Sequence, residues 1–253
     1  MHLDLDVADR CGRLAAWGTS ALQGGARLPD AVRAIVAGDG LHEVADLPGT
    51  SNTRSWTEAL ERLGQLQVTQ LRYVPAVPGD VLGLPGPASF NAAAADSGGA
   101  VLVSGADVGL LPTVTVHGPP EDQITSVRWT SCSVDRRPGS AGPTLSEADR
   151  ELTERLQHSL ADLERLDTAA FRPEALGLLR SPAATTSPLP PGWPDRAHRL
   201  LTRSQGVLAV VAVARRDDGL AVTSVEVDRR NAILRDLQRS ARRALAAAWN
   251  AGR

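Results

Sequence analysis

The chain has 253 residues, of which 42% are hydrophobic and 22% charged, and its formal net charge is −2. This composition is typical of a soluble globular protein with one large or two small domains. All 27 basic residues are arginines. The absence of lysine excludes P-loop NTPases, protein kinases and enzymes that form a Schiff base or bind pyridoxal phosphate, because each of these needs a lysine amine.

Hydropathy indicates a cytoplasmic protein. The first ten residues contain no apolar signal-peptide core, and the longest strongly apolar run, residues 207–214, is shorter than the roughly 20 residues that span a bilayer. Cys11 and Cys132 are far apart in the sequence and form neither a disulfide framework nor a metal-binding pattern. We therefore expect two thiols in a reducing compartment and no membrane association.

Helical periodicity and capping residues predict three helices near the N-terminus, over residues 9–22, 29–37 and 56–63. Ser55 and Glu58 form a capping box at the start of the third helix. Residues 41–47 are expected to form a strand between the second and third helices.

Residues 73–91 form a proline- and glycine-rich loop around which the N-terminal half is organised. Pro78 and Gly79 suit the central positions of a type II turn, and Ser89 is expected to cap a helix over residues 90–95. Alternating, β-branched segments flank this region, and their short connections favour hairpins and an antiparallel sheet. The predicted strands cover residues 68–74, 100–104, 113–117 and 124–134.

The pattern becomes helical after a linker at residues 135–143. Thr144 and Glu147 form a capping box, and an apolar stripe follows at spacings of three and four. Further helices are predicted over 173–179, 195–216 and 224–251, with a proline-rich connector at 181–194. A β-hairpin over residues 207–227 is the alternative to a helical hairpin, and the helices are favoured because Thr223 and Glu226 form a capping box.

These elements predict an α+β protein in two parts. Residues 1–135 would form a mainly antiparallel sheet with flanking helices, and residues 144–253 would be all helical. Whether the two parts pack as one unit is left open.

No catalytic or metal-binding constellation is evident in the sequence. His42, next to Glu43, is the best candidate for a metal ligand or an acid–base group, and a structural histidine is the alternative. By elimination, the proline-rich loop is the best candidate for a ligand site, because long loops on a sheet often bind ligands. The predicted ligand-binding residues are Tyr73, Asp80, Phe90, Asn91 and His117.

Charge is distributed unevenly along the chain. Residues 1–135 contain 8 arginines and 15 acidic residues, a net charge of −7, whereas residues 136–253 contain 19 arginines and 14 acidic residues, a net charge of +5. Arg235, Arg239 and Arg242 share one face of the last predicted helix. They could contact nucleic acid phosphates or an acidic partner, or form a solvated helix face.

The segment PGDVLGLPGPASFNAAAADSGGAVLV, preceded by WTEALERLGQLQVTQLRYVPAV, resembles uncharacterised proteins of high-GC actinobacteria over about residues 55–115. The resemblance implies a bacterial cytoplasmic protein and transfers no function and no catalytic residue.

Three functional hypotheses follow. The first is a non-enzymatic interaction or accessory protein. The second is a small-molecule-binding protein or enzyme that uses the loop at residues 75–91, and the third is nucleic-acid binding through the arginines of the last helix. No cofactor or metal is expected, and the sequence indicates neither a particular partner nor an oligomeric state.

Overall fold

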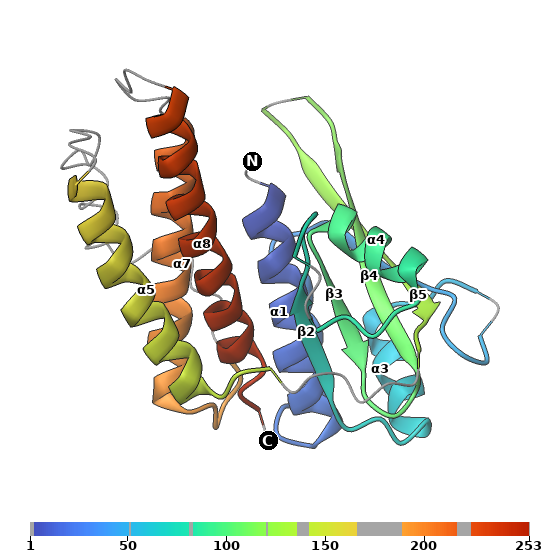
Figure 1. Ribbon diagram of the computed structural model, residues 1–253. Coiled ribbons are helices and arrows are strands. Elements are labelled where there is room, and N and C mark those ends of the chain that lie inside the picture. Colours follow the sequence, from blue (N-terminus) through green and yellow to red (C-terminus); the bar gives the residue numbers. More distant parts are fainter. Residues whose placement is uncertain are drawn as a thin grey trace. The chain divides into compact units, whose positions relative to one another are not determined.

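The structure is a computed structural model that describes residues 3–50, 52–80, 83–119, 121–135, 142–165, 189–216 and 224–252. It divides into two compact units, shown in Figure 1. The sheet unit comprises His2–Ala141, Ser187–Trp193 and Trp249–Arg253, and the helical unit comprises mainly Gly142–Thr186 and Pro194–Ala248. Among the described residues, no helix is long and apolar enough to cross a membrane.

The sheet unit is built on five strands in the order β1-β5-β4-β3-β2. Neighbouring strands are antiparallel except β1 and β5, which run parallel. This arrangement confirms the predicted α+β fold with a mainly antiparallel sheet. The strands are β1 (Leu41–Ala45), β2 (Leu71–Pro75), β3 (Gly99–Val103), β4 (Val108–His117) and β5 (Ile124–Ser133), and the helices are α1 (Leu3–Leu22), α2 (Leu28–Val36), α3 (Trp56–Gln65) and α4 (Ala88–Ser97).

One face of the sheet is covered by α1, which contacts β2, β3 and β4. Residues 11–20 of α1 are buried on every side. Two glycines in this helix allow close packing: a Cβ at Gly12 would overlap the indole of Trp249, and one at Gly18 would lie 2.5 Å from Leu71 Cδ1. Side chains alternate across a strand, so this face also receives Tyr73 of β2 and Trp129 of β5, both buried.

The opposite face is only partly covered. Helix α4 packs there against β3 and β4, and Phe90 lies in an apolar cluster with Val74, Leu102 and Leu111. A Cβ on Gly109 of β4 would overlap the Phe90 ring, which shows how closely helix and sheet approach.

Both edges of the sheet are occupied by groups from elsewhere in the chain. On β2, the Thr19 hydroxyl bonds both Leu71 backbone groups, and the Asn250 amide bonds both Tyr73 backbone groups, with N–O distances of 2.9 and 2.8 Å for Asn250. On β1, Val44 exchanges two backbone hydrogen bonds with Arg54. Because an open edge can pair with another chain, these contacts close both edges at the positions named.

The helical unit contains α5 (Leu145–Arg165), α7 (Asp195–Arg216) and α8 (Ser224–Trp249), of which Trp249 itself belongs to the sheet unit. Leu152, Val211 and Ala241 are fully buried among the three helices. Leu152 belongs to the apolar stripe, at spacings of three and four, that predicted α5.

Local predictions had mixed outcomes. Two of the three predicted capping boxes are confirmed, Ser55 with Glu58 and Thr144 with Glu147. The cap at Ser89 is wrong: α4 begins at Ala88, after Pro87, and has no side-chain cap. Residues 207–216 are helical, which confirms the favoured helix over residues 195–216 and excludes the alternative β-hairpin there. The predicted helix at 173–179 and Thr223, which belongs to the third predicted capping box, lie outside the described residues.

Candidate functional site

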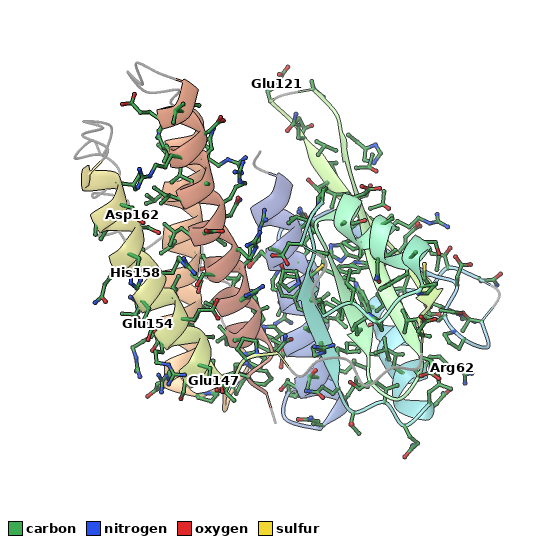
Figure 2. All side chains as sticks on the ribbon, viewed as in Figure 1. Arg62, Glu121, Glu147, Glu154, His158 and Asp162 are labelled. Atoms are coloured by element: carbon green, nitrogen blue, oxygen red, sulfur yellow. The ribbon has the colours of Figure 1, made fainter. Side chains whose placement is uncertain are left out.

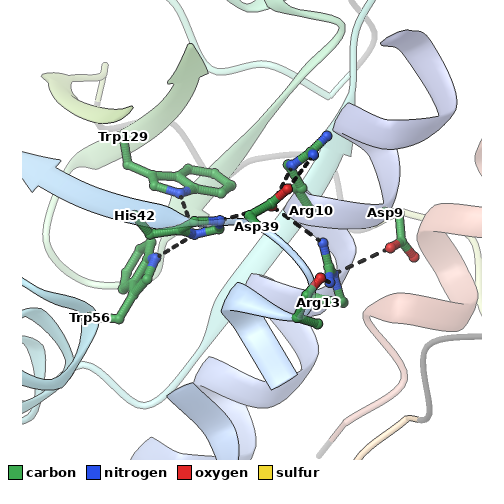
Figure 3. Close-up of polar contacts among 8 residues, drawn as sticks. Asp9, Arg10, Arg13, Asp39, His42, Trp56 and Trp129 are labelled. Carbon is green, nitrogen blue, oxygen red and sulfur yellow. Dashed lines mark hydrogen bonds and ion pairs between the residues drawn. The ribbon is translucent and has the colours of Figure 1, made fainter. Parts of the chain in front are cut away.

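A group of interacting polar side chains lies buried between the helices and the sheet of the sheet unit (Figure 3). We call it the Asp39 cluster. It consists of Asp39 with Arg10, Arg13, His42, Trp56 and Trp129.

Asp39 lies between α2 and β1 and receives a bidentate contact from α1. Arg10 donates from Nε to Oδ2 at 2.8 Å and from Nη2 to Oδ1 at 2.6 Å, and Arg13 Nη2 lies 3.9 Å from Oδ2. Burial alone would raise the pKa of the Asp39 carboxyl, but hydrogen bonds from Arg10 and His42 outweigh burial and lower this pKa to about 2. Asp39 is therefore a carboxylate at neutral pH.

Hydrogen bonds fix the tautomer of His42. Trp56 Nε1 lies 3.2 Å and Trp129 Nε1 3.4 Å from His42 Nδ1. An indole N–H can only donate, so Nδ1 must be the acceptor. The proton is then on Nε2, which donates to Asp39 Oδ2 at 2.9 Å.

The His42 imidazole in the Asp39 cluster is therefore not accessible to a substrate or a metal ion. Both ring nitrogens of His42 have partners inside the protein, and its side chain is only 1% exposed. A metal ion or a substrate proton could reach the imidazole only by displacing an indole or Asp39. What the cluster does is connect α1, the α2–β1 turn, β1, α3 and β5.

The acidic residue that bonds His42 is Asp39 and not its sequence neighbour Glu43. Glu43 follows it directly, but successive side chains of a strand point to opposite faces, and Glu43 instead pairs with Arg128 at 3.7 Å. The signal in the sequence was Asp39, three residues before His42, together with two arginines on the first helix.

The predicted ligand-binding residues of the loop do not converge. Tyr73 is buried on the sheet face that α1 covers. Phe90, a residue of α4, is buried against the opposite face. Asn91 accepts a hydrogen bond from Gly86 N at 3.1 Å and so holds the loop. Asp80 closes the Pro78–Gly79 turn through its backbone, and Gly79 has the positive φ of 82° that a type II turn needs.

His117 lies far from these residues. It ends β4, eight residues beyond the Gly109 that contacts Phe90, which corresponds to about 26 Å along a strand. It is exposed, and its Nε2 is 2.8 Å from Ser126 Oγ on the neighbouring strand.

Three arginines of the helical unit form ion pairs within that unit. Arg196 and Arg203 of α7 both reach Asp149 of α5, at 3.2 and 3.1 Å, and Arg243 of α8 reaches Glu151 at 3.5 Å.

Two of the three predicted contact residues on α8, Arg235 and Arg239, are exposed, and Arg242 is half-buried. Arg239 pairs with Asp236 on its own helix at 3.4 Å.

Neither thiol is activated. Burial raises the pKa of the Cys11 thiol above its usual range, and burial together with the nearby Asp46 raises that of Cys132. A reactive cysteine needs the opposite shift. Within the described parts of the chain, no group of three or more His, Cys, Asp or Glu side chains is placed to hold a metal ion.

A different feature stands out on the sheet face that α4 leaves uncovered. We call this surface the bare face, and it consists of Leu41, Glu43, Thr113, Thr115, His117, Ile124, Ser126 and Arg128, whose register places them on one side of β1, β5 and β4. Leu41 is 54% exposed and Ile124 56% exposed, high values for aliphatic side chains on a sheet face. The β4–β5 hairpin extends beyond the other strands, with Glu121 at its tip (Figure 2).

Fold and site together define an α+β protein with a mixed five-stranded sheet, a closed polar cluster and a separate unit of helices. The chain belongs to the Rv1486c-like family. The model of the N-terminal domain of Rv1486c-like proteins matches residues 11–143, and that of the C-terminal domain matches residues 146–246. No curated protein and no solved structure matches the chain.

Proposed function

We propose that this protein is a non-enzymatic interaction protein whose sheet unit binds a partner protein through the bare face. The observation that carries the proposal is the exposure of Leu41 and Ile124 on the same sheet face that α4 buries elsewhere. Exposed apolar side chains grouped on one surface are typical of interaction sites.

The buried polar groups support binding rather than catalysis. An acid–base residue must reach a substrate proton directly or through one water, but His42 is enclosed by Asp39 and two indoles. The raised pKa values of both cysteines argue against a thiolate nucleophile.

No specific observation favours the other two hypotheses. A ligand site in the loop at 75–91 would need Tyr73 and Phe90 on one side of the sheet. Nucleic-acid binding through Arg235, Arg239 and Arg242 would need these arginines directed at phosphates, whereas Arg239 pairs with Asp236 on the same helix. The resemblance to actinobacterial proteins supports a bacterial cytoplasm as the setting.

The test is co-purification of the tagged full-length protein from its native host. Leu41→Asp places a charge on the bare face and should remove the partner from the eluate. The matched control is Val225→Asp, which changes a valine that is 74% exposed near the start of α8, where an aspartate is favourable to the helix.

A second variant, Thr115→Arg, tests the same face without removing an apolar side chain. Unchanged tryptophan fluorescence would show that each variant is folded. Retention of the same partner by both bare-face variants, or its loss with Val225→Asp as well, would contradict the proposal.

A further inference from the structure

We infer that a second copy of this chain pairs with the open edge of β4, an inference that goes beyond the proposed function. The open edge consists of residues 113–117. Strand β4 pairs with β5 from Val108 to His117, but it pairs with β3 only at residues 108–110. The β4–β5 hairpin extends beyond the other strands (Figure 1), so within the described part of the chain no third strand lies beside residues 113–117.

The direction of the backbone groups shows what this edge offers. Val134, which follows β5, donates its N–H to the Asp107 carbonyl at 3.0 Å. In an antiparallel ladder, residues that bond the neighbouring strand alternate with residues whose backbone groups point away from it. Odd-numbered residues of β4 therefore bond β5, and even-numbered residues point away. The N–H and C=O groups of Val114 and Val116 thus point away from β5, at positions where the described strands provide no partner.

The two ends of the open edge select one register for self-pairing. At the inner end, Pro112 has no N–H and cannot complete a bonded pair. At the outer end, Gly118 has a φ of 94° and so leaves the extended conformation of a strand. An antiparallel copy centred on Thr115 avoids both ends, because Val114 of each copy then lies opposite Val116 of the other. Each of these two pairs exchanges both of its backbone hydrogen bonds.

The side chains in this register are compatible. Val116 is 48% exposed, and pairing places it beside Val114 of the second copy. Thr115 lies opposite Thr115 of the second copy, and cross-strand threonine pairs are favourable. Residues 111–118 contain no Asp, Glu or Arg, so pairing brings no like charges together. The open edge also lacks the charged side chains that commonly protect an edge strand from pairing.

These features favour a second copy over an extended segment of another protein. The second copy supplies a strand of the same length, with valines and threonines at the matching positions. The contact is two-fold symmetric and uses the open edge of both copies, so assembly stops at a dimer. Because only residues 113–117 of each copy take part, the interface is small, and we expect dissociation in the micromolar range.

Analytical ultracentrifugation of the full-length protein over a concentration series tests the dimer. Val116→Pro removes an N–H that points away from β5, so the β4–β5 ladder is retained. The dimer should dissociate about tenfold more readily, because one hydrogen bond is lost from each copy. Val116→Thr is the matched control, since it keeps the N–H and the β-branched shape and should still dimerise. Unchanged tryptophan fluorescence would show that both variants are folded.

Cysteine substitution tests the register. In Thr115→Cys the two substituted residues lie opposite each other with Cα atoms about 4.5 Å apart, a separation that suits a disulfide. Thr113→Cys is the matched control, because Thr113 is also exposed but lies about 14 Å from its equivalent in the second copy. Oxidation should therefore link Thr115→Cys into dimers about tenfold faster than Thr113→Cys.

The outcomes that overturn the inference are distinct from those that test the proposed function. A chain that stays monomeric throughout, equal linking of the two cysteine variants, or undiminished dimerisation of Val116→Pro would refute the pairing. A mixed disulfide of Thr115→Cys with another protein in a host extract, without dimers of this chain, would replace the second copy by that protein. Pairing along β4 leaves Leu41 on β1 in place, so capture of a partner by the bare face is measured independently.

Discussion

Replacing Asp39 by asparagine should destabilise the sheet unit strongly without changing the size of the side chain. In the wild type, Arg10 makes two hydrogen bonds to the Asp39 carboxylate, and its side chain is 10% exposed. Removing the carboxylate charge leaves a buried guanidinium without its counter-ion, a change that costs about 3–5 kcal/mol. The amide oxygen of the new side chain can still accept one hydrogen bond, so we expect about 3 kcal/mol, a large part of the free energy of unfolding of a small domain.

The difference between the wild type and Asp39→Asn should depend on pH. The Asp39 pKa of about 2 lies below the value of 3.8 expected in the unfolded chain. Its contribution to stability is therefore present above about pH 4 and is lost as the pH falls toward 2. The shift corresponds to about 2 kcal/mol after allowance for solvent screening. The gap between the two proteins should narrow by about this amount over that pH range.

Tryptophan fluorescence during denaturant unfolding is the appropriate assay, because all five tryptophans belong to the sheet unit. Asp30→Asn is the matched control, since Asp30 forms an exposed pair with Arg33 at 3.1 Å. Such surface pairs contribute less than about 1 kcal/mol. If Asp39→Asn were no more destabilising than Asp30→Asn, or if the gap stayed constant down to pH 2, the account of the cluster would be refuted.

Three other changes test separate parts of the structure. Gly12→Ala should destabilise the sheet unit by about 1–3 kcal/mol in denaturant unfolding, because the new Cβ overlaps Trp249, and a cost near zero would contradict this packing. Asn250→Ala removes two hydrogen bonds to the β2 edge and should cost about 1–2 kcal/mol. It should also increase self-association in analytical ultracentrifugation, and a fully stable monomeric variant would count against edge closure. In native protein a thiol reagent should label Cys132 slowly and leave Cys11 unmodified, and rapid labelling of Cys11 would be inconsistent with its burial.

Local signals in the sequence predicted local structure well. The two capping boxes mark helix starts because their hydrogen bonds join residues only three apart, as between Ser55 and Glu58. The contacts that define the sites are not local. Arg10 and Asp39 are 29 residues apart, and Asn250 reaches Tyr73 across 177 residues. No periodicity or spacing encodes such pairs, because they depend on how the elements pack.

One physical cause separates the residues that the sequence grouped into a candidate site. Neighbours along a strand, such as His42 and Glu43, face opposite sides of the sheet. The same alternation separates Tyr73, under α1, from Val74, which packs with Phe90 under α4. A sequence shows which residues are adjacent, but the face that each side chain joins depends on strand pairing. The parallel pairing of β1 with β5 had no signal in the sequence and sets the composition of the bare face.

The bonded edge positions on β1 and β2 and the exposed bare face can be explained together. Covering the exposed parts of Leu41 and Ile124 would stabilise the fold by about 1 kcal/mol each, but both side chains remain exposed. At the same time, Thr19 and Asn250 bond the outer backbone groups of Leu71 and Tyr73 on β2, where an extended segment could otherwise pair without regard to its sequence. The edge positions named are therefore unavailable for strand pairing, whereas the bare face can be covered only by side chains that fit it. We therefore expect the exposed aliphatic side chains of the bare face to serve the proposed interaction.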